Sequence, residues 1–326
     1  MKQGSRSLHR MPRKIRSRKP RALKPGAILG VFAPASPADE AKWDAGLKEL
    51  KRLKYGVSLR DDPFSGPEGY FAASTEERRE ELVEAAAAAT VNGLIAVRGG
   101  YGSNYILDGL SRRPFRTPKC LIGFSDITTL QIFLWEKCGW VTIYGPMVAG
   151  GLDAGPGAQG GYDEESFLAA IRKTESGWYI PMQGETIRTG EAIGTLLGGC
   201  LTLVETTLGT PWELGTRGTI LVLEDRGMRP WQVDRALMHL KQAGKFDGIR
   251  GVVLGDFPEC EPPMAGSPTV RDVCTRILGA LDVPMVFGAP VGHTQRPMLT
   301  LPLGVKARLS AKGEGVLEIL EPAVVP

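Results

Sequence analysis

Short apolar segments alternate with longer amphipathic ones along the first half of the chain. Five short segments predict strands, and most of them are uninterrupted apolar stretches of the kind buried inside a sheet. They lie at residues 28–33, 57–60, 93–97, 119–123 and 141–145. Apolar runs of this length, bounded by turn residues, favour strands over helices.

The segments between these strands have helical periodicity. Four apolar residues spaced along 43–53 fall on one stripe of a helix. The segment STEERREELVEAAAAA opens with Ser74 and Glu77 at the spacing of a capping box. Strands that alternate with helices predict an α/β fold with a parallel sheet covered on both faces.

The pattern changes between about residues 150 and 190, where the stretch GGLDAGPGAQGGYDEES is rich in glycine and predicts a loop. Beyond it, strands are expected at 219–223, 251–257 and 284–288, with helices at about 230–243 and 269–281. Short β segments, LTLPLG and GVLEIL, end the chain. We therefore expect four parts: a disordered tail (1–25), an N-terminal domain (26–165), a linker (166–190) and a C-terminal domain (191–326).

Charge separates the tail from the rest of the chain. The net charge is +4, but ten of the 40 Lys and Arg residues lie in the first 24 residues, where no acid occurs. The remaining residues contain 30 basic and 36 acidic side chains. The tail lacks apolar periodicity and is expected to be a flexible extension. Alternatively, the start codon was assigned too early and translation begins at Met11. Without a basic, aromatic-rich stretch in the remaining chain, no nucleic-acid partner is expected.

The cysteine count and the lengths of the apolar runs argue against disulfide-bonded, zinc-binding, membrane-spanning and secreted proteins. Five cysteines without a CxxC pair argue against a disulfide framework and against a zinc site, and fit a reducing cytoplasm. No apolar run approaches the roughly 18 residues of a membrane span, and no signal core follows the basic start. We expect a cytoplasmic protein without a metal or cofactor and without membrane insertion.

Ser125 stands directly between a predicted strand and a predicted helix, in CLIGFSDITTL. A serine at this corner is either a helix N-cap or a nucleophile. The N–H of Asp126 would be one of the unpaired donors at a helix start, suited to stabilising an oxyanion. The match to the nucleophile elbow G-x-S-x-G is incomplete, since Ile127 replaces the last glycine. Both interpretations therefore stay open at this motif.

The segment VRGGYGS also follows a predicted strand. Gly99 and Gly100 allow the backbone to approach a ligand and direct N–H groups at it, although a plain tight turn is equally consistent. The full dinucleotide motif G-x-G-x-x-G is absent, as is the phosphate-binding GK[ST]. Arg98 is a candidate partner for a substrate carboxylate or a loop-holding ion pair.

Two further residues could serve as the acid and the base of a catalytic triad with Ser125. Glu224 ends a predicted strand, where it either orients a histidine or is a solvated turn residue. Of the three histidines, His9 is in the tail and His239 is in a predicted helix, which leaves His293 in a Gly/Pro-rich loop as the candidate base. The order Ser…Glu…His fits a serine hydrolase and is shared with α/β-hydrolases. A non-catalytic anion-binding or peptide-binding protein is the other alternative.

Several strings in this order resemble the LD-carboxypeptidases, a family of serine peptidases. The resemblance covers about residues 26–320 and rests on GVFAPASP, GYFAASTEERREEL, RGGYGS, IGFSDIT, LEDRG…VDRALMHL, GVVLGDF and GH…LTLPLG. It implies a triad of Ser125, Glu224 and His293, with oxyanion donors on the backbone of Asp126 and of the Gly99-Gly100 pair. It also implies a parallel α/β domain like that of class I amidotransferases, joined to a smaller β-rich C-terminal domain, often in a homodimer.

The same resemblance suggests the reaction. The typical substrate is the murein tetrapeptide, from which these enzymes release terminal D-alanine in cytoplasmic peptidoglycan recycling. A branch of the family instead cleaves aminoacyl-sulfamoyl nucleotides and gives immunity to microcin-type antibiotics. The sequence does not separate these two activities.

Overall fold

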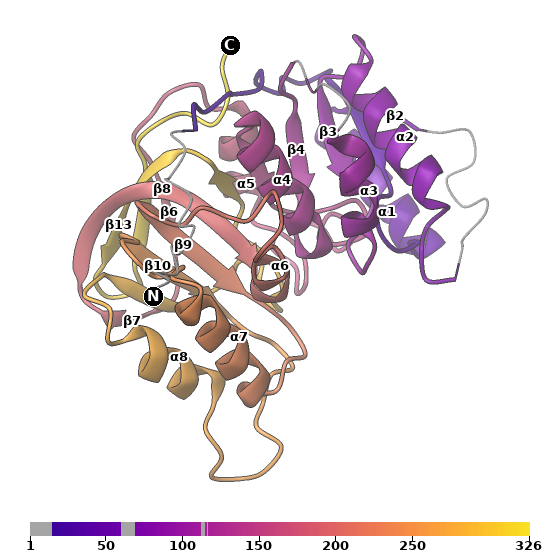
Figure 1. Cartoon of the computed structure of the whole chain (residues 1–326). Coiled ribbons are helices and arrows are strands. Elements are labelled where there is room, and N and C mark those ends of the chain that lie inside the picture. Colours follow the sequence, from indigo (N-terminus) through magenta and orange to yellow (C-terminus); the bar gives the residue numbers. More distant parts are fainter. Residues whose placement is uncertain (1–14, 60–68, 112–114, 116) are drawn as a thin grey trace, which may run out of the picture.

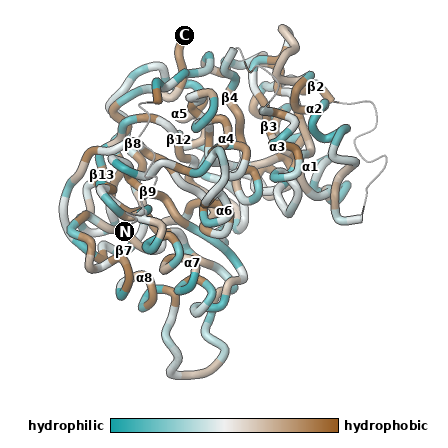
Figure 2. The backbone as a smooth tube through the Cα atoms, in the orientation of Figure 1, coloured by the Kyte–Doolittle hydropathy of each residue, from teal (hydrophilic) through white to brown (hydrophobic). Residues whose placement is uncertain are grey.

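A computed structural model describes residues 15–59, 69–111, 115 and 117–326. These residues form a mixed α/β structure with two sheets that lie side by side (Figure 1). Apolar residues are concentrated along the central strands, which form the core (Figure 2). The α/β-hydrolase alternative requires one continuous sheet, so the two sheets speak against it.

The first sheet has six strands within the described residues, in the order β12-β5-β4-β3-β1-β2. Its parallel strands are β1 (Ile28–Phe32), β2 (Gly56–Ser58), β3 (Gly93–Ala96), β4 (Cys120–Gly123) and β5 (Thr142–Tyr144). All five predicted strands are confirmed, but each is one or two residues shorter than expected, β5 most of all. The last strand, β12 (Leu301–Leu303), comes from the far end of the chain and pairs antiparallel with β5.

The helices of this half begin where the sequence provides caps. Asp39 accepts a hydrogen bond from the N–H of Lys42 and caps α1 (Glu40–Arg52). Ser74 and Glu77 form the expected capping box of α2 (Thr75–Ala87). The other helices are α3 (Ser103–Leu110) and α4 (Thr128–Cys138). Residues 128–135 of α4 are buried on every side, because this helix lies between the two sheets.

The second sheet has eight strands among the described residues, in the order β6-β14-β13-β8-β9-β10-β11-β7. Its parallel centre consists of β8 (Gly190–Cys200), β9 (Thr219–Glu224), β10 (Gly251–Gly255) and β11 (Met285–Ala289). Antiparallel strands flank this centre: β6 (Trp178–Pro181), β7 (Glu185–Arg188), β13 (Lys306–Ala311) and β14 (Val316–Ile319). The helices are α5 (Glu164–Arg172), α6 (Leu201–Thr206), α7 (Pro230–Gln242) and α8 (Val270–Leu278).

Three expectations about chain organisation need correction. The range 166–190, expected to be a linker, contains most of α5 and also β6 and β7, which pair in the second sheet. The second sheet is the larger of the two, whereas a smaller C-terminal part was expected. The predicted segment LTLPLG contains β12, which joins the first sheet. Strand pairing between distant segments is not visible in local sequence, which explains these errors.

The predicted tail is also wrong in part. Residues 1–14 lie outside the described residues, but residues 15–25 pack against the fold. Arg18 exchanges backbone hydrogen bonds with Gly139 and Val141, and Leu23 is fully buried. Ala22 donates to the carbonyl of Val325, which brings the two ends of the described chain together (Figure 1). The basic composition concealed a short segment whose backbone and few apolar side chains find partners.

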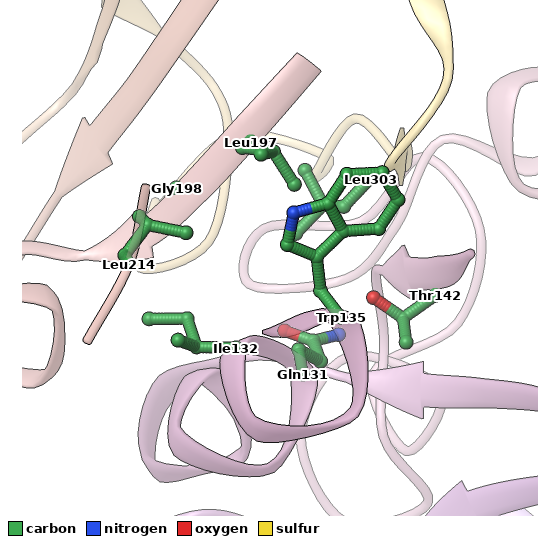
Figure 3. Close-up of a pocket in the computed structure, with 8 residues that line it drawn as sticks. All are labelled: Gln131, Ile132, Trp135, Thr142, Leu197, Gly198, Leu214 and Leu303. Atoms are coloured by element: carbon green, nitrogen blue, oxygen red, sulfur yellow. The ribbon is translucent and has the colours of Figure 1, made fainter. Parts of the chain in front are cut away.

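The two halves pack tightly against each other. Figure 3 shows a small cavity between Gln131 and Trp135 of α4 on one side and Leu197 of β8 on the other, with Leu303 of β12 at its edge. Its volume is about 10 Å³, at the lower limit for a single water molecule. This interface is therefore core, and the functional cleft lies elsewhere.

Candidate active site

Ser125 follows β4 and opens a short 3₁₀ turn (Ser125–Ile127) that leads into α4. Its φ angle is +60°, a left-handed conformation that non-glycine residues adopt mainly where the surrounding structure enforces it. Neither this turn nor α4 has a side-chain cap. The structure therefore does not support the N-cap interpretation of Ser125, and its side chain is half-buried at the cleft.

The glycine loop lies directly against this serine. A Cβ atom on Gly99 would stand 2.8 Å from Cβ of Ser125, 2.9 Å from its Oγ and 3.2 Å from the backbone N of Asp126. Gly100 has a φ of +106°, and a Cβ there would meet Oγ of Ser36 at 2.3 Å. Only glycine fits at both positions, so the backbone of this loop borders the space in front of Ser125.

Two buried side chains that the sequence analysis missed hold this loop. Arg78 of α2 is fully buried and donates to the carbonyls of Ala73 and Gly102, at 3.0 and 2.9 Å, and to that of Pro34. The carboxylate of Asp126 accepts the N–H of Ser103 at 2.7 Å and so ties the start of α3 to the serine corner. Burial raises the pKa of Asp126, and these hydrogen bonds oppose the shift.

Glu224 and His293 form a direct pair on the second sheet. Nδ1 of His293 lies 2.8 Å from Oε2 of Glu224, and the backbone N–H of His293 donates to the same oxygen at 2.9 Å. The hydroxyl of Tyr144 donates to Oε1 at 2.5 Å. Glu224 is 0% exposed and the His293 side chain 13% exposed, so the interpretation of Glu224 as a solvated turn residue is wrong.

Each member of the pair shifts the pKa of the other toward its charged form. Burial raises the pKa of Glu224, but the attraction of His293 and the hydrogen bonds from His293 and Tyr144 outweigh it and leave that pKa below its ordinary value. Burial lowers the pKa of His293, whereas the charge and hydrogen bond of Glu224 raise it by more, so that it lies above 6.5. A carboxylate that accepts from Nδ1 leaves Nε2 as the nitrogen that exchanges protons with a substrate or a nucleophile.

Two glycines make room for this carboxylate. A Cβ on Gly255, at the end of β10, would stand 2.4 Å from Cβ of Glu224. A Cβ on Gly292, just before His293, would stand 2.4 Å from the carboxyl carbon of Glu224. Gly255 in the string GVVLGDF and Gly292 just before His293 are therefore required by close packing on Glu224.

A second polar cluster holds the loop on which His293 lies. Arg296 donates to Asp256 through Nε at 3.3 Å and through a terminal nitrogen at 2.5 Å, and also to the carbonyls of Gln183 and Gly288. The hydroxyl of Thr294 donates to Asp256 as well. Asp256 is itself part of the GVVLGDF string and Arg296 lies three residues after His293, but nothing local in the sequence indicates their roles.

These groups meet at one open cleft of about 420 Å³ between the two sheets. Ser125 and His293 both line it, together with Arg98, Gly99 and Gly100, while Glu224 lies behind His293. Arg98 donates to the carbonyl of Pro37 at 3.1 Å. The other charged residues on the cleft wall are Asp39, Lys42, Asp153 and Arg226. His239 is 55% exposed, pairs with Glu205 and is not among the residues that line this cleft.

The described residues contain no cluster of three or more His, Cys, Asp or Glu side chains suited to a metal ion. In the same residues, no helix is both long and apolar enough to span a bilayer.

Comparisons with known proteins match both halves of the chain. Residues 29–145 match the model of the LD-carboxypeptidase N-terminal domain, and residues 193–309 match that of the C-terminal domain. A putative carboxypeptidase of Streptomyces coelicolor is 36% identical over 315 residues, which cover 94% of this chain and 97% of the relative. A probable murein peptide carboxypeptidase of Bacillus subtilis is 34% identical over 304 residues, 92% of this chain and 94% of the relative.

Solved structures agree with these matches. A muramoyltetrapeptide carboxypeptidase from Oxalobacter formigenes is 27% identical, with a TM-score of 0.80 over 92% of this chain and all of the other. The microcin C7 self-immunity protein MccF, solved with aspartyl sulfamoyl adenosine, is 24% identical, with a TM-score of 0.82 over 94% and 99% of the two chains. The latter similarity shows the fold alone. Both family models, and relatives above 30% identity along nearly the whole chain, establish that this protein is a peptidase of the LD-carboxypeptidase family.

Proposed function

We propose that the protein is a serine-type LD-carboxypeptidase that releases terminal D-alanine from the murein tetrapeptide during peptidoglycan recycling. The observation that carries this proposal is the hydrogen-bonded pair of Glu224 and His293 on the same cleft as Ser125. The relatives named as murein peptide carboxypeptidases support the choice of substrate.

The mechanism follows from the roles that these atoms allow. Nε2 of His293 accepts the proton of Ser125 as Oγ attacks the peptide carbonyl, and Glu224 holds the imidazole through Nδ1 and stabilises its positive charge. The backbone N–H groups of Asp126 and of the Gly99-Gly100 pair stabilise the oxyanion. His293 then protonates the leaving amine of D-alanine as the C–N bond breaks. Water, deprotonated by His293, cleaves the acyl-enzyme ester and restores Ser125.

Arg98 is proposed to bind the free carboxylate of the terminal residue. It lines the cleft next to Gly99, and a guanidinium pairs with a carboxylate through two parallel hydrogen bonds. The test compares Arg98→Ala with the wild type on the tetrapeptide and on its C-terminal amide. A loss of kcat/KM confined to the free acid supports this role, and an equal loss on both substrates excludes it.

The deciding experiment is mass spectrometry of disaccharide tetrapeptide incubated with wild type and with Ser125→Ala. Loss of one alanine with the wild type alone supports both the reaction and the nucleophile. Loss with both proteins contradicts the role of Ser125. If neither protein acts, an aminoacyl-sulfamoyl adenylate is the next substrate, because the relative named as the MccF self-immunity protein of Escherichia coli is 27% identical to this chain. Absence of turnover on both compounds would favour a non-catalytic binding protein.

Three broader features belong to the same proposal. The first sheet, with its five parallel strands, would correspond to the parallel domain of class I amidotransferases. The working form would be a homodimer that acts on small peptides. A cytoplasmic location is supported by the five cysteines, all of which are free thiols.

A further inference from the structure

A cation beside the catalytic histidine has no part in the proposed mechanism. Arg226 follows Glu224 by two residues and lines the same cleft as Ser125 and His293. Burial and the positive charge of Arg226 both lower the pKa of His293, and the effect of Glu224 outweighs them. The guanidinium of Arg226 therefore lies close enough to the imidazole for its charge to be felt there.

The backbone of Arg226 is fixed by a buried carboxylate. Asp225 is 5% exposed, and its Oδ1 accepts the N–H of Arg226 at 2.8 Å. The other oxygen, Oδ2, accepts from the backbone N–H and the hydroxyl of Thr202, at 2.8 and 2.7 Å. The N–H of Gly227 donates to the carbonyl of Pro258 at 3.0 Å, which joins this turn to the segment after β10. Arg226 thus starts from a defined place on the cleft wall.

The guanidinium of Arg226 already holds a carboxylate, that of Glu259. The two side chains are 54% and 55% exposed. An ion pair this exposed contributes little to stability, so another carboxylate can take the place of Glu259 at small cost. Arg98 differs in this respect, because its guanidinium donates to the backbone carbonyl of Pro37.

The backbone that presents Glu259 is strained. Phe257 and Glu259 have φ angles of +50° and +60°, a left-handed conformation that is uncommon for residues with large side chains. Residues in such conformations persist where the surrounding structure enforces them, and they are concentrated at active sites. Pro258, which lies between the two, lines the cleft. The strained turn is therefore part of the cleft wall and directs Glu259 toward Arg226.

The proposed reaction brings a second carboxylate to this part of the cleft. His293 protonates the leaving amine, and the terminal carboxylate of the substrate is attached to the carbon next to that nitrogen. This carboxylate must therefore lie within a few ångströms of the imidazole, where the charge of Arg226 is felt. A guanidinium stays charged throughout the working pH range and pairs with a carboxylate through two parallel hydrogen bonds.

We propose that Arg226 is a specificity-determining residue that binds the terminal carboxylate of the substrate, with Glu259 as its counter-ion in the free enzyme. This inference rests on the proposed carboxypeptidase function. It adds a residue on the second-sheet side of the cleft to the recognition proposed for Arg98. The substrate carboxylate and Glu259 compete for one guanidinium.

The test measures KM and kcat for the tetrapeptide and for its C-terminal amide. In Arg226→Gln, KM for the free acid should rise roughly 10- to 100-fold, the effect of losing hydrogen bonds to a charged group. Since the contact is made before and during the reaction, kcat should change little, and the loss should be confined to the free acid. Arg226→Lys keeps the charge without the planar fork and should give an intermediate KM.

Glu259→Gln separates this role from a purely structural one, because the expected change has the opposite sign. Without the competing carboxylate, KM for the free acid should fall by about threefold. Glu259→Asn provides the same readout if the glutamine variant is unstable, since asparagine tolerates a left-handed φ better. An ion pair that only holds the turn would give an equal or higher KM when Glu259 is removed.

Arg229→Ala is the matched control. Arg229 follows Arg226 by three residues, is exposed, donates to the carbonyl of Glu261 at 3.3 Å and is not among the residues that line the cleft. Its removal should leave the ratio of the two KM values unchanged. Thermal melting of each variant separates a local effect from loss of the fold.

The outcomes distinguish the two proposals. If the wild type releases no alanine from the tetrapeptide, the proposed carboxypeptidase function fails and the role of Arg226 falls with it. If the wild type is active but Arg226→Gln weakens the free acid and the amide equally, only the role of Arg226 is wrong. An unchanged or higher KM for the free acid in both Glu259 variants also overturns it.

Discussion

The two sheets prepare their sides of the cleft by different physical means. On the first sheet, backbone geometry positions the groups: Ser125 has a left-handed φ, and Gly99 leaves no room for a side chain beside it. On the second sheet, hydrogen bonds between side chains position the groups: Glu224 accepts from His293 and Tyr144, and Arg296 holds the loop of His293. The reaction rate should therefore be sensitive to added atoms on the first-sheet side of the cleft. On the second-sheet side, it should be sensitive to the loss of charges and hydrogen bonds.

The largest effect is expected for Glu224→Gln. The substitution removes the charge that stabilises the imidazolium, so kcat/KM should fall by roughly 10³- to 10⁴-fold. Because Glu224 raises the pKa of His293, and because the base must be neutral, the acidic limb of the pH–rate profile should move to lower pH. Kinetics across the pH range measure both effects.

The control for this prediction is Glu205→Gln, which removes the acid of the exposed Glu205–His239 pair. It should leave both the rate and the profile unchanged. An acidic limb that stays in place in Glu224→Gln would show that His293 is not the titrating base.

Gly99→Ala tests the close packing of the glycine loop on Ser125, on the first-sheet side of the cleft. The added Cβ would stand within 3 Å of both Cβ and Oγ of Ser125, so the serine must shift. A displacement of this kind should lower kcat by roughly 10²-fold, while the acidic limb stays in place because the Glu224–His293 pair is untouched. The matched substitution is Gly56→Ala on β2, where the nearest atom would be 3.5 Å away. Equal rates for Gly99→Ala and wild type would contradict the close packing of this loop on the nucleophile.

Arg296→Ala tests the loop that positions His293. Loss of the contacts to Asp256, Gln183 and Gly288 should loosen the loop and lower kcat roughly tenfold, the cost of a modest loss of positioning. The acidic limb should move to lower pH as the contact between His293 and Glu224 weakens. Arg271→Ala removes a bidentate ion pair to Glu185 outside the cleft and should do neither. A rate loss without a shift of the limb would indicate a general structural role.

The smallest effect on rate is expected for Tyr144→Phe, about threefold, because Glu224 keeps both hydrogen bonds from His293. Its effect on stability depends on pH. The Tyr144 hydroxyl helps to hold the pKa of Glu224 below its ordinary value of 4.5. This lowered pKa stabilises the fold above pH 4.5, and the stabilisation is lost as the pH falls through the folded-state pKa. The difference in Tm from wild type should therefore shrink on acidification.

Tyr55→Phe is the control for this variant. The buried Tyr55 hydroxyl donates to the carbonyl of Leu23 at 2.9 Å, far from any carboxylate of the cleft. It should lower Tm without changing the rate. A Tm difference for Tyr144→Phe that is the same at pH 7 and pH 4 would contradict its link to the ionisation of Glu224.

Much of the first sheet was predictable because its signals are local. Buried parallel strands are uninterrupted apolar runs, and the capping box of Ser74 and Glu77 marks the start of α2. The second half was harder to predict, since β6, β7 and β12 are short and their partners are distant in sequence. Residues 15–25 were misjudged because composition describes an average, whereas Leu23 is buried individually.

The candidate site residues likewise divide into those with a local sequence signal and those that depend on distant partners. Ser125, the Gly99-Gly100 pair and Glu224 stood out because each lies at or just beyond the end of a predicted strand, while His293 emerged from the scarcity of histidines. Tyr144 and Arg296 had no distinguishing local pattern, and Arg78 and Asp256 lie within the strings GYFAASTEERREEL and GVVLGDF without any local sign of their roles. Their importance arises from contacts with segments 24 to 113 residues away, and no window of neighbouring residues contains that information.

The sequence by itself determined the order of strands and helices in the first half of the chain, the strand–helix corner at Ser125 and the short supply of histidines, because these depend on residues close together in the chain. Only the tertiary structure decided that Glu224 is buried behind His293 and that Gly255 and Gly292 make room for it. The physical reason is that burial and close contact belong to pairs of distant segments, and the fold alone brings those segments together.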